Sequence, residues 1–318
     1  MRSRASGAEG VTDLLWLLAG FACAAAGGDL FVSGAVRIAR GLRVPPALVG
    51  ATLAAFATSS PEVAVAVASS LAGEGDVAFG NVTGANVVNL TMVLGVGLLF
   101  GGLRVDRQAL RRDLALAVAV PGVTALLLLD GRLSRGDGVA MLAGFALWLA
   151  VAIRGGLEHR GRNHDPRAEA VHPLAGGALA LAGLALLATA GWLVAGAAPG
   201  VGRLLGLDDF VIGATLVAVG TTLPELATVI AARRRGQDEV GLGAILGSCI
   251  FNGLFILGIA AAIQPVMPAP WPALVALAMG GLAAILAVPP PSGELRQRRG
   301  VALMALYLAF VLLQLRSG

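Results

Sequence analysis

Two glutamates, Glu62 and Glu225, each directly follow a proline inside apolar segments long enough to cross a membrane. The 15 residues that end at Glu62 align without a gap with the 15 that end at Glu225 and match at 8 positions. The two glutamates are 163 residues apart (225 − 62). An ionisable side chain within a membrane costs about 3 kcal/mol on insertion scales, so a duplicated one indicates a functional site. The alternative is that each glutamate snorkels to the membrane surface. A glutamate side chain is short and both glutamates lie centrally in their apolar segments, so a functional site is the favoured interpretation.

The prolines themselves predict further ligands. A proline within a helix lacks an N–H and displaces the carbonyl group four residues earlier, so Pro61 and Pro224 should free the carbonyl oxygens of Ala57 and Gly220. Hydroxyl groups stand on the same turns, and the same 163-residue offset pairs Asn89 with Asn252 in the following segments. The predicted side-chain ligands are Glu62, Glu225, Thr58, Ser59, Thr221, Thr222, Asn89 and Asn252.

A cluster of carboxylate, hydroxyl, amide and carbonyl oxygens suits hard cations such as Na⁺ and Ca²⁺. Taken singly, the threonines, serines and glycines are equally compatible with helix packing, and Gly80, Gly84, Gly243 and Gly247 have the small-xxx-small spacing of close helix pairs. Their coincidence with the duplicated Pro-Glu favours ion binding. Two ionised carboxylates about 5 Å apart repel by roughly 3 kcal/mol at an effective dielectric constant of 20, so an empty site should resist occlusion.

The composition requires that these motifs lie in a membrane. Hydrophobic residues make up 57% of the 318 residues, charged residues make up 13%, and the mean hydropathy is +0.83. An ordinary soluble domain has about 25% charged residues. The apolar segments have the length of membrane-spanning helices, which predicts an all-α membrane protein. Cys23 and Cys249 lie within apolar segments and read as packing residues.

Proline and glycine punctuation divides the chain into ten predicted transmembrane helices in two five-helix repeats. The first repeat is 1–154, with its motif in 48–95, and the second is 173–318, with its motif in 211–258. Because five is odd, the second repeat should have inverted topology, which is typical of transporters. The expected crossings are roughly 12–36, 46–71, 77–100, 110–129, 137–154, 173–197, 207–232, 240–263, 270–289 and 300–315.

The basic residues predict the orientation. All 23 are arginines, and 17 of them fall in the odd-numbered loops. By the positive-inside rule these loops face the cytoplasm and both termini lie outside. The net charge of +4 thus reflects topology, and no nucleic-acid partner is expected. Residues 155–172 form a polar cytoplasmic linker. Its three histidines, which lie at 159, 164 and 172, could bind a metal, although a solvated linker is the favoured interpretation.

The motifs around the glutamates resemble the two α-repeats of the sodium/calcium exchanger family, within the calcium/cation antiporters. The resemblance rests on Thr-Ser-Ser-Pro-Glu62 and Gly-Thr-Thr-Leu-Pro-Glu225, with Gly-Asn-Val-Thr-Gly-Ala-Asn-Val-Val-Asn89 and Gly-Ala-Ile-Leu-Gly-Ser-Cys-Ile-Phe-Asn252. It implies ten helices, alternating access and export of Ca²⁺ driven by Na⁺ entry. It also implies that Ca²⁺ is held by Glu62, Glu225, Thr58 and Thr221, and that the cation sites are completed by Ser59, Thr222, Asn89, Ser248 and Asn252.

Two positions depart from that family's pattern. Ala85 replaces a common serine, whose counterpart here is Ser248, and Asn252 replaces a common aspartate. We therefore expect a Na⁺/Ca²⁺ antiporter of the cell (inner or plasma) membrane, with a cation/H⁺ antiporter (Ca²⁺/H⁺ or Na⁺/H⁺) as the alternative.

Other classes fit the sequence less well. No HExxH, GxSxG or paired intramembrane aspartates are present, so an enzyme is not expected. Fused inverted repeats also disfavour a channel. The expected partners are the transported ions and the lipid bilayer, with no cofactor and no obligate protein partner.

Overall fold

The computed structural model describes residues 7–105, 107–162, 173–204 and 222–315, and these residues are almost entirely helical. Within them, seven helices are long and apolar enough to cross a membrane. A bent pair, Pro46–Thr58 with Ser60–Leu71, would make an eighth. The predicted all-α membrane fold is therefore confirmed, while the count of ten crossings in two inverted repeats stays a prediction.

The first part of the chain begins with one long helix and continues with helices that are interrupted or bent. Its elements are α1 (Gly7–Leu42), α2 (Pro46–Val49), the π-helical turn η1 (Gly50–Ala54), α3 (Ala55–Thr58), α4 (Ser60–Leu71), α5 (Gly75–Val88), the π-helical turn η2 (Asn89–Val93), α6 (Leu94–Leu99), β1 (Leu103–Arg104), α7 (Arg107–Leu127), η3 (Leu128–Asp130) and α8 (Arg135–Arg162).

The second part repeats several of these interruptions. Its described elements are α9 (Pro173–Leu204), α12 (Leu223–Arg234), α13 (Asp238–Ile250), the π-helical turn η6 (Phe251–Ile256), α14 (Leu257–Ile263), α15 (Pro270–Ala287), β2 (Glu294–Leu295) and α16 (Gln297–Leu315).

Two predicted boundaries need comment. The linker predicted at 155–172 is helical in its first part, because α8 continues to Arg162; its remainder lies outside the described residues. A helix that leaves the membrane can keep its backbone hydrogen bonds in water, so a change in polarity does not end it. The crossing predicted at 207–232 is described only from Thr222 onward.

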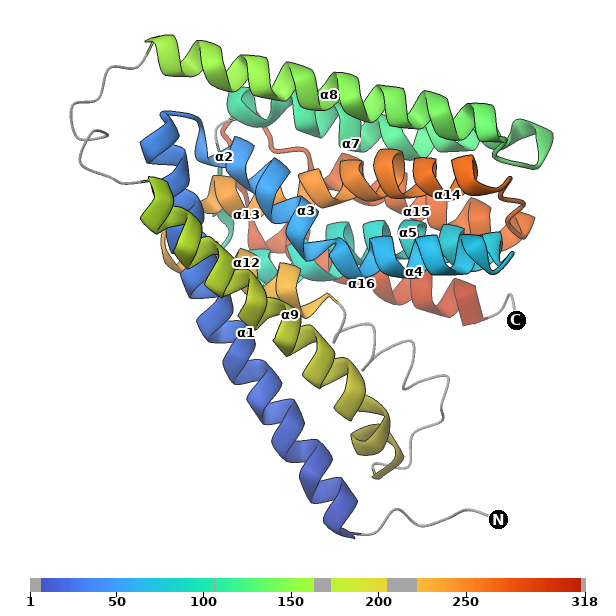
Figure 1. Cartoon of the computed structure of the whole chain (residues 1–318), viewed down its shortest axis with the longest axis horizontal. Helices are drawn as coiled ribbons and strands as arrows, with labels where there is room; N and C mark the ends of the chain where they lie inside the picture. Colours follow the sequence, from blue (N-terminus) through green and yellow to red (C-terminus); the bar gives the residue numbers. More distant parts are fainter. Residues whose placement is uncertain (1–6, 106, 163–172, 205–221, 316–318) are drawn as a thin grey trace.

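Helices α1 and α9 form a pair that runs obliquely to the other helices (Figure 1). Their backbones approach so closely that a Cβ on Gly34 would lie 2.7 Å from the carbonyl oxygen of Gly176. Small residues permit such contacts between membrane helices. The pair contacts the rest of the protein mainly through α12 and α2.

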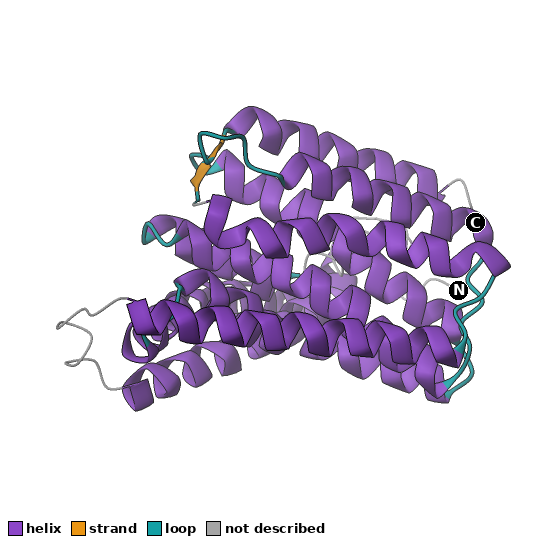
Figure 2. Cartoon of the chain, turned by 90° about the horizontal axis from the view of Figure 1, so that it is seen from above, coloured by secondary structure: helices purple, strands orange, loops and turns teal. Residues whose placement is uncertain are grey.

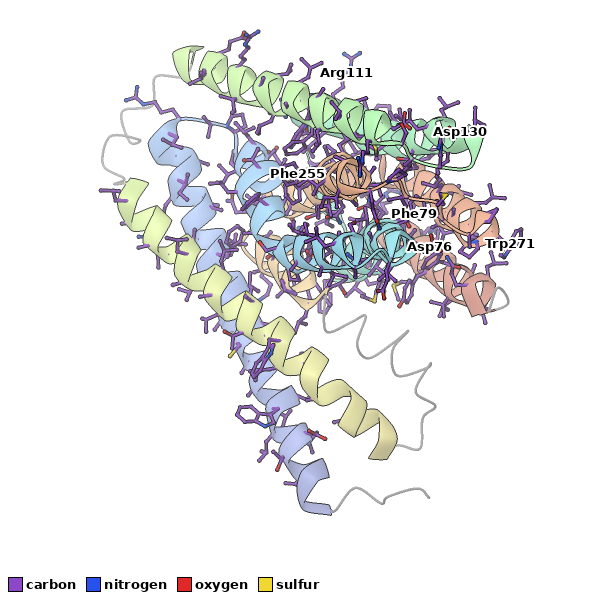
Figure 3. All side chains as sticks on the ribbon, turned by 45° about the vertical axis from the view of Figure 1, so that its right-hand side comes forward. Asp76, Phe79, Arg111, Asp130, Phe255 and Trp271 are labelled. Carbon is purple, nitrogen blue, oxygen red and sulfur yellow. The ribbon has the colours of Figure 1, made fainter. Side chains whose placement is uncertain are left out.

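The loops gather at the two ends of the bundle in alternation. At one end, β1 pairs with β2 (Figure 2), and Arg233 donates a hydrogen bond of 3.1 Å to the carbonyl oxygen of Gly101. At the other end, Leu133 pairs with Val266, and Asp130 and Trp271 lie toward this end (Figure 3). Among the described loops, the third, seventh and ninth of the predicted topology thus lie at one end and the fourth and eighth at the other. Which end faces the cytoplasm stays a prediction.

Helices α5 and α13 occupy the centre of the bundle and are the most buried of the apolar helices. A Cβ on Gly243 of α13 would lie 2.7 Å from the carbonyl oxygen of Ala47, so the predicted close approach occurs here against α2. For Gly80 and Gly84 of α5, no atom of the described residues lies within 4 Å of such a Cβ. Of the predicted ligands, Ser248 lies in α13, and Asn89 and Asn252 lie in the π-helical turns that directly follow α5 and α13.

Candidate ion-binding site

Both Pro-Glu motifs begin a new helix directly after a break. Ser59, between α3 and α4, has φ −87° and ψ 10°, and Thr222, which precedes α12, has φ −93° and ψ 4°. These residues are equivalent under the 163-residue offset, and each proline stands within the first two positions of the new helix, where its missing N–H costs nothing. The chain bends by 48° at the first break. The sequence repeat thus corresponds to a repeated backbone conformation.

The predicted side-chain ligands that the structure describes are all buried in the interior. Glu62 is 6% exposed and Glu225 is 2% exposed. Several polar atoms of the predicted ligands are buried without a hydrogen-bond partner, whereas buried polar groups are normally paired. The unpartnered atoms of predicted ligands are Ser59 Oγ, Glu62 Oε2, Asn89 Oδ1, Glu225 Oε2, and both side-chain polar atoms of Asn252. This concentration of unsatisfied oxygens is what a cation would satisfy.

The two repeats meet directly at this cluster. The hydroxyl groups of Thr58 and Ser248 are 3.5 Å apart and buried, and Thr58 also donates a hydrogen bond of 3.0 Å to the carbonyl oxygen of Ala54. The carboxyl groups of Glu62 and Glu225 are close enough to interact electrostatically. Residues of the two motif regions therefore lie against each other here, and that they form one ion-binding site stays a prediction.

Each predicted asparagine ligand lies in a π-helical turn. Asn89 is the first residue of η2, and Asn252 is the second residue of η6. A π-helical turn inserts a residue and changes the direction of the side chains around it, and such turns often occur at functional sites. These turns were not predicted from the sequence, although the two asparagines at equivalent positions indicated that the two segments were alike.

The carbonyl oxygen of Ala57 differs from the prediction. At the break before Pro61, the carbonyl oxygen of Ala57 accepts a hydrogen bond from a backbone N–H of the cap, so it is not left free as predicted. The chain turns tightly at Ser59, which brings a later N–H within reach. A carbonyl oxygen has a second lone pair, so a ligand role for Ala57 stays a prediction. Gly220 and Thr221 lie outside the described residues.

Two further asparagines, which were not predicted from the sequence, donate hydrogen bonds to the backbone at or next to predicted ligands. Asn81 Nδ2 donates a hydrogen bond of 3.2 Å to the backbone oxygen of Glu62, and Asn86 Nδ2 donates one of 3.1 Å to the backbone oxygen of Cys249. Asn81 precedes Asn89 by eight residues, so helical spacing could have placed both on one face of the apolar segment that begins at Gly75. No group of three or more histidine, cysteine or acidic side chains placed to hold a metal occurs in the described part of the chain.

Comparison with known proteins gives the same assignment. The sequence profile of the sodium/calcium exchanger protein family matches residues 12–154 and 174–316. The inner membrane protein YrbG of Escherichia coli is 35% identical over 245 residues, which cover 74% of this chain and 75% of YrbG. The sodium/calcium exchanger MaX1 of Methanosarcina acetivorans is 29% identical, with 94% of this chain and 97% of MaX1 covered.

Solved structures of the sodium-calcium exchanger NCX_Mj are similar over nearly the whole length. The structure soaked with zero Na⁺ and Ca²⁺ superposes with a TM-score of 0.80 at 26% identity and covers 94% of this chain and 97% of NCX_Mj. A second structure, soaked with 2.5 mM Na⁺ and 10 mM Sr²⁺, gives 0.79 at the same identity. From its two profile matches and these relatives, the chain belongs to the sodium/calcium exchanger family, a family of cation-transporting membrane proteins.

Proposed function

We propose that this protein moves Ca²⁺ out of the cell in exchange for Na⁺, by alternating access to the shared site. The observation that carries the proposal is the buried group of unpartnered oxygens around Glu62 and Glu225. Two carboxylates balance one Ca²⁺ or two Na⁺, and the neutral oxygens suit either ion. Burying the empty, doubly charged site would be costly, so the protein should not pass between its outward-open and inward-open states without a bound cation. This property favours exchange of ions over a leak.

The proposed architecture comprises two inverted five-helix halves, 1–154 and 173–318, joined by a cytoplasmic linker, with both termini outside. Two observations support it: the equivalent breaks at Ser59 and Thr222, and the gathering of odd-numbered loops at one end. In such transporters, one group of helices moves relative to the rest around a central site. The oblique pair of α1 and α9, which is packed mainly on itself, suits the moving group.

The test is ion flux in vesicles that contain only the purified protein. Vesicles loaded with Na⁺ and diluted into Na⁺-free medium with radioactive Ca²⁺ should accumulate Ca²⁺, and an ionophore that dissipates the Na⁺ gradient should abolish uptake. Uptake that depends on an imposed pH gradient and ignores Na⁺ would support the second candidate, a cation/H⁺ antiporter. The observation that favours a cation/H⁺ antiporter is that the buried residue 252 is a neutral asparagine. A site with fewer negative charges holds fewer Na⁺ ions, so Na⁺ would drive transport less strongly.

A further inference from the structure

The polar residues of helix α5 that lie near Glu62 stand at different positions from the polar residues of the equivalent helix α13. Asn81, Ala85 and Asn89 follow one another at intervals of four residues, so they lie along one face of the helix. Asn81 donates a hydrogen bond to the backbone oxygen of Glu62, so this face is turned toward α4 at Asn81, and Asn89 is buried. Asn81 therefore lies one turn from Ala85, toward the Gly75 end of the helix.

The equivalent residues of α13 show the opposite pattern. Ala244 corresponds to Asn81, and Ser248 corresponds to Ala85. In α13 the hydroxyl of Ser248 lies 3.5 Å from that of Thr58, while Ala244 is buried. The first repeat thus lacks an oxygen at position 85 and has one at position 81. The polar group has moved by one helical turn.

The orientation of the Asn81 amide is fixed by its partner. The backbone oxygen of Glu62 is only an acceptor, so the atom 3.2 Å from it must be the amide nitrogen. This leaves the Oδ1 atom of Asn81, on a half-buried side chain, without a hydrogen bond to any described residue. The Oε2 atom of Glu62, the residue whose backbone Asn81 contacts, is also buried and unpartnered.

We propose that Asn81 is a ligand for Na⁺ beside Glu62 and supplies the oxygen that Ala85 lacks. The inference rests on the proposed Na⁺/Ca²⁺ exchange and adds a specificity-determining residue to it. A position with one neutral amide oxygen and a carboxylate shared with the central cation favours a monovalent ion. A divalent ion needs more negative charge and more oxygen ligands. Asn81 should therefore matter for Na⁺ more than for Ca²⁺.

The experiment measures equilibrium binding of radioactive Ca²⁺ to purified protein, with and without competing Na⁺. In Asn81→Ala, the Na⁺ concentration that displaces half of the Ca²⁺ should rise about five- to tenfold, as expected for loss of one ligand bond. The Kd for Ca²⁺ should change by less than about twofold. Adding Ala85→Ser to Asn81→Ala should restore Na⁺ competition, because it returns a hydroxyl to the adjacent turn.

A purely structural role for Asn81 predicts a different result. Loss of its bond to the backbone of Glu62 would weaken Ca²⁺ and Na⁺ binding equally, and Ala85→Ser would not restore either; that outcome overturns the proposal. The control is Thr83→Val, since Thr83 lies on another face of α5 and donates its hydroxyl to the carbonyl oxygen of Phe79. It should leave Na⁺ competition unchanged. If Na⁺ displaces Ca²⁺ equally well from wild type and Asn81→Ala, only the role of Asn81 fails. If Na⁺ does not displace Ca²⁺ from the wild type, the proposed Na⁺ coupling fails, and this inference with it.

Discussion

Asn86 donates a hydrogen bond of 3.1 Å to the backbone oxygen of Cys249, which is the residue at the equivalent position of the other repeat. The sulfur of Cys249 in turn lies 4.0 Å from the backbone oxygen of Asn86. Two equivalent positions that contact each other must lie close to the axis that relates their repeats. The centre of the protein is therefore between α5 and α13, next to the predicted ligand Ser248.

We expect the Asn86→Leu variant to loosen this central contact. The variant keeps the approximate volume but leaves the carbonyl oxygen of Cys249 without its side-chain donor, which costs about 1–3 kcal/mol when a buried group is involved. The melting temperature of the purified protein should fall, and Ca²⁺ transport should decrease with it. A matched control is Gln297→Met, because Gln297 donates a similar bond of 3.0 Å to Leu99 from an exposed position. Equal stability of Asn86→Leu and wild type would contradict this role.

Close backbone packing predicts that Gly243→Ala is strongly destabilising. The added Cβ would lie 2.7 Å from the carbonyl oxygen of Ala47, and backbone cannot move aside as a flexible side chain can. Overpacking of this kind costs about 1–3 kcal/mol. Thermal unfolding in detergent provides the measurement.

The control for Gly243→Ala is Gly144→Ala in α8, where no described atom lies within 4 Å of the new Cβ. This substitution should be neutral or stabilise the helix by about 0.5–1 kcal/mol. Similar losses in both variants would mean that the contact between α13 and α2 is not tight.

Features that depend on the nearby sequence could be predicted, whereas features that depend on packing between helices could not. The all-helical class and the placement of Glu62 and Glu225 after helix breaks followed from composition, proline chemistry and the repeat. The π-helical turns at Asn89 and Asn252 did not follow, because an extra residue in a helical turn is accommodated by packing and has no fixed sequence signal. The contacts of Asn81 and Asn86 were not predicted, because an asparagine in a membrane helix is equally compatible with a role in helix packing.

The orientation in the membrane is a prediction that cysteine labelling can test. In a background in which Cys23 and Cys249 are replaced by alanine, a cysteine introduced at Glu74, between α4 and α5, should react in intact cells with a thiol reagent that cannot cross the membrane. A cysteine at Arg296, next to β2, should react only after the cells are opened. The reverse pattern would show that the termini face the cytoplasm.

The departures at Ala85 and Asn252 predict altered coupling. With two formal negative charges, the site balances one Ca²⁺ or two monovalent ions, so a third Na⁺ would enter uncompensated. We expect weaker Na⁺ coupling than a strict exchange of three Na⁺ for one Ca²⁺, with protons able to substitute. Ca²⁺ flux at clamped voltage, against imposed Na⁺ and H⁺ gradients, provides the measurement, and the Ala85→Ser and Asn252→Asp variants should shift the coupling toward Na⁺. Steep three-Na⁺ exchange in the wild type, without a proton effect, would refute this expectation.

The most direct test of the shared site is Na⁺-driven Ca²⁺ uptake by vesicles that contain Glu62→Gln or Glu225→Gln. Each variant removes one buried charge at nearly constant volume, and a divalent ion held by one carboxylate in place of two should bind at least about tenfold more weakly. The account predicts that both variants fold, as judged by an unchanged elution profile, and transport almost no Ca²⁺. Glu74→Gln, at an exposed turn, should transport like wild type. Wild-type uptake by either Glu62→Gln or Glu225→Gln would contradict the assignment of the site.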